Sequence, residues 1–285
     1  MKLFITQILC FISISVLTAQ INPGARQIAI ASSDAGQADD VFAVFNNPAG
    51  LAQMDWREIG LYYSPAPFGM SELANGFAAY QEPTAIGVFA AGFMTYGFEL
   101  YRENKFALAY SIRILDKFFA GMTVFYQTLS IKNYGSTGTY YLIVGGLAYF
   151  NKEIRFGFSV ENPTRSTYGH EQNQIPVVFN CGLSYDILTD LTINIAGQKE
   201  LDFNPSLRFG TEYNLIKYLT LRTGFSNEPG TFSAGIGINY SFLQLDYAVF
   251  THQDLGLTHQ AGLIIQFGSD EPRAQKIRNN LFPNN

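Results

Sequence analysis

The stretch 206–213 reads Ser206-Leu207-Arg208-Phe209-Gly210-Thr211-Glu212-Tyr213, in which mostly apolar and aromatic side chains alternate with small or charged ones. The same period of two continues through 219–226, 233–240 and 243–249. Because successive side chains of a β-strand point to opposite faces of its sheet, this alternation predicts consecutive strands that each carry one apolar face.

The composition narrows the class of protein. The chain has 285 residues, of which 47% are apolar, 15% aromatic and only 14% charged, with a net charge of −5. A soluble domain usually carries about 25% charged residues. This hydrophobicity excludes a disordered chain. The excess of acidic over basic residues also makes a nucleic-acid partner improbable, since few basic groups are left to neutralise phosphates.

A soluble β-sandwich would show the same alternation as a membrane β-barrel, so three further observations decide between these two architectures. The apolar face is rich in Tyr and Phe near strand ends, as the aromatic girdles of a membrane barrel are. The polar face carries Arg, Glu, Gln and Asn, which suits a wet or plugged lumen better than a packed core. The links between strands are alternately short and long, and a sandwich fold does not require its link lengths to alternate in this way.

Fourteen strands are predicted, over 57–64, 72–81, 84–94, 104–115, 117–130, 139–150, 152–161, 174–186, 189–199, 203–214, 217–226, 230–240, 242–250 and 256–267. The even-numbered links are tight, the first of them Gln81-Glu82-Pro83, and the longest odd-numbered link is 162–173. Outer-membrane barrels have an even strand number, short periplasmic turns and longer outer loops. The fold class is therefore an all-β, transmembrane antiparallel β-barrel of about 14 strands over 57–268, which leaves no bare backbone edge in lipid.

Charged residues of the predicted strands fall on the polar face. An arginine on the lipid face near the membrane midplane would cost about 2–4 kcal/mol. Mutual ion pairs that fill the lumen are a simpler interpretation of these residues than a role in conduction. The predicted lumen charges are Arg113, Arg155, Arg208, Arg222, Glu161, Glu212 and Asp246.

The two ends of the chain lie outside the predicted barrel. Residues 1–19, with Lys2, an apolar run and then Thr18-Ala19, have the form of a bacterial signal peptide. Cleavage there would leave Cys181 as the single thiol, so no internal disulfide is expected. The tail 269–285 is expected in the periplasm, either as a solvated end or as a docking peptide for a periplasmic partner.

Residues 20–56 do not alternate and are small and apolar in character. Val41, Phe42, Val44, Phe45 and Leu51 would be exposed to water if this segment hung below the barrel. We therefore expect it to fold into the lumen as a hatch. Asp39 and Asp40 are then natural partners for inward-pointing arginines.

Three motifs of this segment carry a resemblance to a known family: Gly24-Ala25-Arg26, Ala38-Asp39-Asp40 and Asn47-Pro48-Ala49-Gly50-Leu51-Ala52. The segment resembles the hatch of FadL-type outer-membrane proteins, most closely that of their PorV/PorQ branch from the Bacteroidetes group. The resemblance implies a hatch that plugs a fourteen-stranded barrel. Its motif residues here are Asp39, Asp40, Asn47, Pro48, Ala49 and Gly50.

The resemblance implies two functions. FadL-type channels pass long-chain fatty acids or other hydrophobic molecules by passive diffusion, whereas PorV-type members serve type IX secretion and hold or shuttle cargo proteins. The longest outer loop, 162–173, is short and polar, which departs from the long, greasy capture loops of the transporters. We therefore predict a non-enzymatic outer-membrane protein of secretion and cargo attachment, with a channel for hydrophobic molecules as the alternative. A third hypothesis is a structural barrel that acts through its tail and periplasmic turns.

Partners follow from these hypotheses: outer-membrane lipid, secreted cargo or other secretion-machinery proteins, and a hydrophobic small molecule. The sequence offers no sign of catalysis. His170, His252 and His259 are not spaced as a metal site, and neither a Gly-x-Ser-x-Gly elbow nor a Walker-type phosphate loop occurs. Glu161 and Glu212 could act as a pair, but structural ion pairs perturb carboxylates as readily as catalysis does. No enzyme activity, metal or cofactor is predicted.

Overall fold

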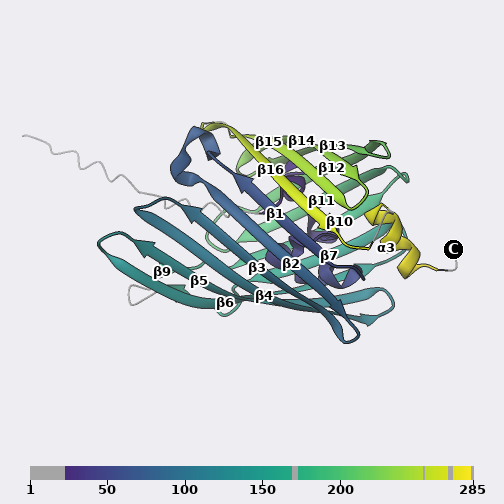
Figure 1. The fold of residues 1–285 in the computed structure, drawn as a ribbon, viewed down its shortest axis with the longest axis horizontal. Coiled ribbons are helices and arrows are strands. Elements are labelled where there is room, and N and C mark those ends of the chain that lie inside the picture. The colour runs from purple at the N-terminus through teal and green to yellow at the C-terminus, as the bar shows by residue number, and fades with distance from the viewer. Residues whose placement is uncertain (1–22, 169–172, 253, 269–271, 284–285) are drawn as a thin grey trace, which may run out of the picture.

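The computed structural model describes residues 23–168, 173–252, 254–268 and 272–283, so the predicted signal peptide 1–19 lies outside the described residues. Fourteen antiparallel strands form one closed barrel, in which each strand pairs with its neighbours along the chain and the first pairs with the last (Figure 1). This confirms the predicted fold class. The small N-terminal helices lie inside the barrel, where the chain is coloured purple.

The barrel strands are β1 (Glu58–Ser64), β2 (Asn75–Thr84), β3 (Gly87–Gly97), β4 (Tyr101–Leu115), β5 (Phe118–Ile131), β6 (Gly135–Tyr149), β7 (Ile154–Glu161), β10 (Val178–Asp186), β11 (Leu191–Glu200), β12 (Ser206–Ile216), β13 (Leu219–Asn227), β14 (Gly230–Tyr240), β15 (Leu243–His252) and β16 (Gly256–Gln266). A two-stranded hairpin, β8 (Thr167–Tyr168) and β9 (Asn173–Gln174), lies in the link between β7 and β10. We call the end with the links 85–86, 116–117, 150–153, 187–190, 217–218 and 241–242 the short-turn end, and the opposite end the long-loop end.

The two faces of the wall follow the sequence alternation. On β12, Leu207 is 63% exposed and points outward, whereas Ser206 and Glu212 are buried inside. Large apolar side chains are exposed on strands all round the barrel, among them Leu61, Phe106, Leu108, Ile195, Leu245 and Tyr247. Such a surface is unfavourable in water and matches the acyl chains of a bilayer. Cys181 also lies on this exposed face.

The first tight turn differs from the prediction. The chain turns at 85–86, and Gln81-Glu82-Pro83, predicted as the turn, belongs to β2, with Pro83 opposite Val88. A proline is tolerated at the end of a strand where no ladder bond needs its missing N–H. The turn itself is closed by a hydrogen bond from the Thr84 Oγ1 to the Gly87 carbonyl, at 2.6 Å, with Gly87 at a φ of +137°.

The wall is uneven in height. β4, β5 and β6 have 15, 14 and 15 residues, whereas β7 has 8 and pairs with β6 only over 143–149. Beyond β7 the link 162–177 folds toward the lumen. Asn162 and Ile175 are buried there, and the Asn162 Nδ2 donates to the carbonyl of Ile175 at 2.8 Å. The described ends of this link, 162–168 and 173–177, therefore cover part of the long-loop end.

The tail forms a helix, α3 (Arg273–Leu281), at the short-turn end, with Arg273, Ile277 and Leu281 buried (Figure 1). In this part of the tail the expectation of a solvated end is wrong, because the helix has a face that packs against the barrel and the hatch. No helix of the described residues is long and apolar enough to cross a membrane.

Candidate functional site

The interior of the barrel is filled by the described part of the hatch, residues 23–56. It contains α1 (Ala25–Ala29), α2 (Ala43–Asn46) and two short 3-10 helices, η1 (Asp34–Gly36) and η2 (Pro48–Gln53). α1 contacts β13 to β16, η1 contacts β7, β10 and β11, and η2 contacts β3 to β6. The hatch therefore spans the cross-section of the lumen and meets the wall on all sides.

Glycines on strands around the barrel allow the hatch to come this close. A Cβ atom built on any of them would lie within 2.6 Å of a hatch atom, nearer than real Cβ contacts come. Glycine weakens a strand and is expected where another backbone approaches, so these positions are explained by the hatch. We call this set the glycine belt: Gly60, Gly92, Gly121, Gly145, Gly157, Gly210, Gly224 and Gly235.

The motif 47–50 forms one of the tightest contacts with the wall. The Asn47 side chain caps η2 by accepting from the Ala49 N–H at 3.3 Å, and its Nδ2 donates to the carbonyls of Ala35 and Gly146 at 3.0 and 3.3 Å. Pro48 occupies the first turn of η2, where no N–H is needed. A Cβ on Gly50 would meet the Ala38 carbonyl oxygen at 1.9 Å. The packing of this motif thus explains why Asn47, Pro48 and Gly50 stand at these three positions.

One side of the hatch is held by a buried ion network. The Arg26 guanidinium donates to both Glu212 oxygens, at 2.8 Å each, and to Asp39 at 2.6 Å. Arg222 reaches the same Glu212 at 2.5 Å and Asp246 at 2.7 Å. Because all five side chains are buried and each charge has a partner, the network fixes the hatch to β12, β13 and β15.

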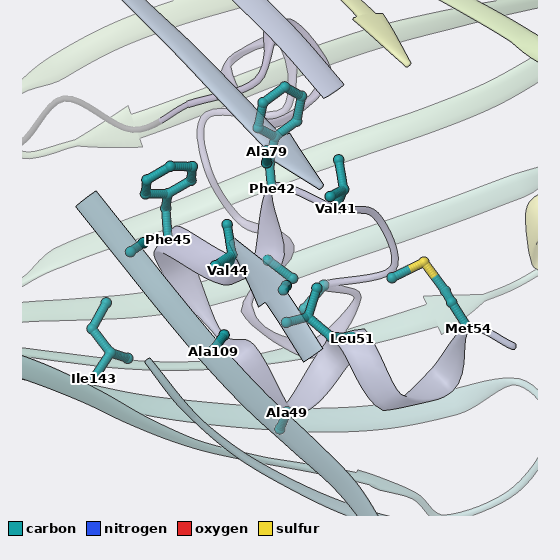
Figure 2. Packing of buried hydrophobic residues seen from close by; sticks show 14 of the residues in the cluster. Val41, Phe42, Val44, Phe45, Ala49, Leu51, Met54, Ala79, Ala109 and Ile143 are labelled. Atoms are coloured by element: carbon teal, nitrogen blue, oxygen red, sulfur yellow. The ribbon is translucent and has the colours of Figure 1, made fainter. Parts of the chain in front are cut away.

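The opposite side of the hatch is apolar. Phe45 packs against Phe77 of β2 and Phe125 of β5, at ring-centroid distances of 5.1 and 6.2 Å. Val44, Phe45, Leu51 and Met54 of the hatch belong to one apolar cluster with wall residues such as Ala109 and Ile143 (Figure 2). Dispersion and burial, without ion pairs between these side chains, hold this side of the hatch.

The apolar packing continues beyond the hatch in both directions. The same contiguous cluster includes Ile175 from the link at the long-loop end, with Tyr168 packed against it, and Ile277 and Leu281 of α3 at the short-turn end. We call this cluster the apolar column. It reaches from the long-loop end to the short-turn end through the apolar side chains of the hatch itself, which are packed against the wall, and it lies beside the ion network.

A cavity of about 970 Å³ opens at the short-turn end beneath the hatch. We call it the vestibule. Hatch residues Arg26 and Asp39, the lower ends of β12 to β15, and residues 272–282 around α3 line it, and many of the lining side chains are charged. A chamber lined by many charged groups and by apolar side chains therefore lies on the inner side of the hatch, next to the apolar column.

The predicted lumen charges are distributed unevenly. Arg155, Arg222, Glu212 and Asp246 are buried inside; the Arg155 guanidinium donates to Asp186 at 2.9 Å. Arg208 and Glu161 lie closer to the long-loop end, outside the Arg26 network; Arg208 donates to Gln198. Arg113 is a correction: it is exposed and its Nη2 donates to the carbonyl of Asp116 at 2.6 Å, because it lies at the rim, past the enclosed part of β4.

Glu58 and Arg273 are among the charged residues of the interior that were not singled out from the sequence. Glu58, fully buried at the start of β1, accepts from the Trp56 Nε1 at 2.7 Å, from the Val41 N–H at 3.1 Å and from Arg273. Glu58 shares its strand parity with the inward Gly60 and Tyr62, so the alternation could have found it. Nothing in the strand pattern could have found Arg273, because it lies on α3.

Asp34 of the hatch is buried without an ion pair of its own. Burial, with a contribution from the charge of Asp40, raises the pKa of Asp34 from 3.8 to about 7, although Arg26 opposes the shift. Below about pH 4 the carboxyl is neutral in both folded and unfolded chains. Above about pH 7 it is charged in both, but the folded chain must bury the charge, so Asp34 lowers stability progressively as the pH rises between these values.

Asp34→Asn is therefore expected to raise the thermal unfolding temperature of the detergent-solubilised protein at pH 8 and to leave it unchanged at pH 4. Each kcal/mol corresponds to about 2–4 °C for a chain of this size. Asp202→Asn, at an exposed loop residue, is the control and should have no effect at either pH. An equal shift of Asp34→Asn at both pH values would contradict this account.

The described residues contain no cluster of three or more His, Cys, Asp or Glu side chains that could hold a metal ion. His259 of β16 forms a hydrogen bond with the Tyr247 hydroxyl at 2.6 Å, and His252 accepts from the Asp254 N–H at 3.2 Å. His170 lies outside the described residues. The arrangement offers paired charges on one side and apolar packing on the other, and both hold the hatch in the barrel.

No family model matches the sequence, and no curated protein matches it. Solved structures do share the fold. The toluene transporter TodX of Pseudomonas putida aligns with a TM-score of 0.64 and 12% identity, covering 86% of this chain and 96% of that chain. A FadL homologue of Pseudomonas aeruginosa gives a TM-score of 0.60 at 12% identity, with 85% and 96% covered.

A TodX mutant described as a monoaromatic hydrocarbon channel aligns with a TM-score of 0.67 and 11% identity, covering 86% of this chain and 98% of that chain. These neighbours are FadL-family outer-membrane channels and not enzymes. At this identity the likeness is one of fold alone. A likeness of fold does not test which branch of the family this chain resembles most, so the PorV/PorQ assignment stays a prediction.

Proposed function

We propose that this chain is a plugged channel of the outer membrane that admits hydrophobic small molecules, and that it is not an enzyme. The observation that carries the proposal is the apolar column, in which apolar side chains of the hatch and the wall form one contiguous cluster from the long-loop end to the short-turn end. The fold likeness to a toluene transporter and a FadL homologue supports it. The short-turn end then faces the periplasm, as short turns do in such barrels.

The two sides of the hatch suit different tasks. The ion network around Glu212 resists displacement, because separating buried charges is costly. The apolar side is held by burial and by hydrogen bonds from Ser111 and Thr123 to hatch carbonyls, so a molecule of aromatic or alkyl chemistry can replace side-chain contacts there without separating charges. Passage is passive in this account: the solute partitions into the column and leaves at the vestibule.

Uptake by cells tests the proposal. Cells that lack the gene are expected to take up labelled toluene and palmitate more slowly than complemented cells, whereas uptake of a polar sugar stays equal in both. Phe45→Ala should raise uptake by shortening a side chain of the column. Phe45→Asp should lower it about tenfold, because the solute would have to pass a buried charge.

Tyr134→Asp, at a loop residue that is 90% exposed, is the matched control and should transport as the natural chain does. Folding of each variant is checked by the heat-dependent mobility shift of barrels on gels. Equal hydrophobic uptake with and without the gene would overturn the proposal.

A role in type IX secretion and surface attachment of cargo stays a prediction, which rests on the resemblance of the hatch motifs. Its partners would be secreted cargo or other proteins of the secretion machinery. Deleting the gene should then leave cargo proteins inside the cell or detached from its surface. Intact secretion and attachment in the deletion strain would remove this second function.

A further inference from the structure

α3 covers the inner side of the hatch. The Arg273 guanidinium donates to the Asp39 carbonyl at 2.7 Å and to Gln244 at 3.3 Å, bonds Glu58, and lies 3.4 Å from the Met54 sulfur. Met54 is only 1% exposed. The helix therefore closes over a part of the hatch that belongs to the apolar column.

The contact is complementary in charge and in apolar character. Lys276 pairs with Asp55 at 3.4 Å and lies over the Trp56 ring at 4.3 Å, and Arg278 pairs with Asp186 at 2.6 Å. Ile277 and Leu281, one turn apart, are buried in the same cluster as Leu51 and Met54. Phe282, directly after the helix, packs on the Tyr149 ring at 6.1 Å.

The helix has little stability of its own. It has nine residues, and the side chain of its N-cap, Pro272, makes no capping bond. Isolated helices shorter than about 12–15 residues are marginal in water, so α3 is a helix because it is docked. Of its three described ion pairs, Lys276–Asp55 is partly exposed and holds weakly, whereas Arg273–Glu58 and Arg278–Asp186 have buried carboxylates and must break when the helix undocks. An element of this kind opens as a unit at a lower cost than the barrel unfolds.

We propose that α3 is a gate at the inner end of the apolar column: docked, it closes the column against the vestibule, and undocked, it opens the way to the vestibule. The identity of the solute rests on the proposed function, whereas the movement of α3 does not. Ile277 and Leu281 are the last described members of the column on this side of the hatch, so a solute that passes the hatch meets them before it reaches water.

Cysteine labelling tests the movement. In the mature chain with Cys181→Ala, Met54→Cys places a thiol beneath α3. A charged thiol reagent is expected to modify this thiol slowly, and about tenfold faster when Ile277→Asp releases the helix. Asn280→Asp, at an exposed residue of the same helix, should leave the rate unchanged. Met94→Cys, at a residue of β3 that is 2% exposed, should stay protected throughout, which shows that the barrel and hatch remain intact.

Cross-linking tests the consequence. Asp55→Cys and Lys276→Cys replace an ion pair whose ends lie 3.4 Å apart, and dibromobimane would tie α3 to the hatch. Vesicles that contain the tied protein should lose toluene and palmitate flux, whereas the same double variant without the cross-linker keeps it.

The outcomes separate the two proposals. If Met54→Cys is labelled no faster with Ile277→Asp, or if the tied protein conducts as well as the free one, α3 is not a gate. If labelling responds to Ile277→Asp while neither the free nor the tied protein carries a hydrophobic solute, the gate stands and the proposed solute class is wrong.

Discussion

Gly121→Val is expected to displace the hatch and to cost about 3 kcal/mol of stability, at the upper end of the usual effect of overpacking. A Cβ on Gly121 would lie 2.4 Å from the carbonyl carbon of Pro48 and 2.5 Å from the nitrogen of Ala49. These are backbone atoms and cannot rotate away. Hydrogen bonds from Ser111 to the Ala49 carbonyl and from Thr123 to the Val44 carbonyl, at 3.2 and 2.8 Å, prevent the hatch from sliding aside.

Two measurements check this result. The midpoint of thermal unfolding in detergent should fall, and the barrel in a planar bilayer should conduct ions where the natural chain does not. Gly197→Val is the control: a Cβ there meets only the Cys181 sulfur, at 3.9 Å, an ordinary contact. A Gly121→Val barrel that is as stable and as closed as the control would show that the hatch does not pack as described.

Glu212→Ala should destabilise the protein by about 3 kcal/mol, because two buried arginines each lose one of their carboxylate partners. Arg26 would keep Asp39 and Arg222 would keep Asp246, but the carboxylate that joins the hatch to the wall would be gone. The free energy of unfolding in detergent, from a denaturant titration, measures the loss.

The control for this prediction is Glu82→Ala. Glu82 pairs with Arg57 at the rim, at 2.8 Å and with the arginine 60% exposed, and exposed pairs contribute about 1 kcal/mol or less. A loss for Glu212→Ala no larger than that for Glu82→Ala would mean that the network does not anchor the hatch.

The alternation of 206–249, together with the aromatic strand ends and the alternately short and long links, was sufficient to predict the barrel and the inward position of Arg222, Glu212 and Asp246. A strand has only two faces, and lipid on one of them leaves no other place for a charge. The same rule placed Arg113 in the lumen, which is wrong. The alternation tells which face of the strand a side chain lies on, but not whether the barrel wall still encloses that side chain near the end of the strand.

The remaining differences have local causes. Pro83 suggested a turn, although a proline at a strand end is compatible with the sheet. The sequence of α3 does not stand out from that of a polar tail. Its nine residues contain three apolar ones, Ala274, Ile277 and Leu281, and its stability comes from the surface on which it docks. Contacts of that kind depend on tertiary structure, which no local pattern contains.

The glycine belt has a consequence for how such a protein can change over generations. Because hatch atoms occupy the space that side chains at these wall positions would need, a bulkier residue on either surface requires a smaller one opposite. The plug and its housing are thus not exchangeable modules: grafting a foreign plug into this cylinder would fail on sterics alone, and inherited substitutions in the two should occur in matched pairs.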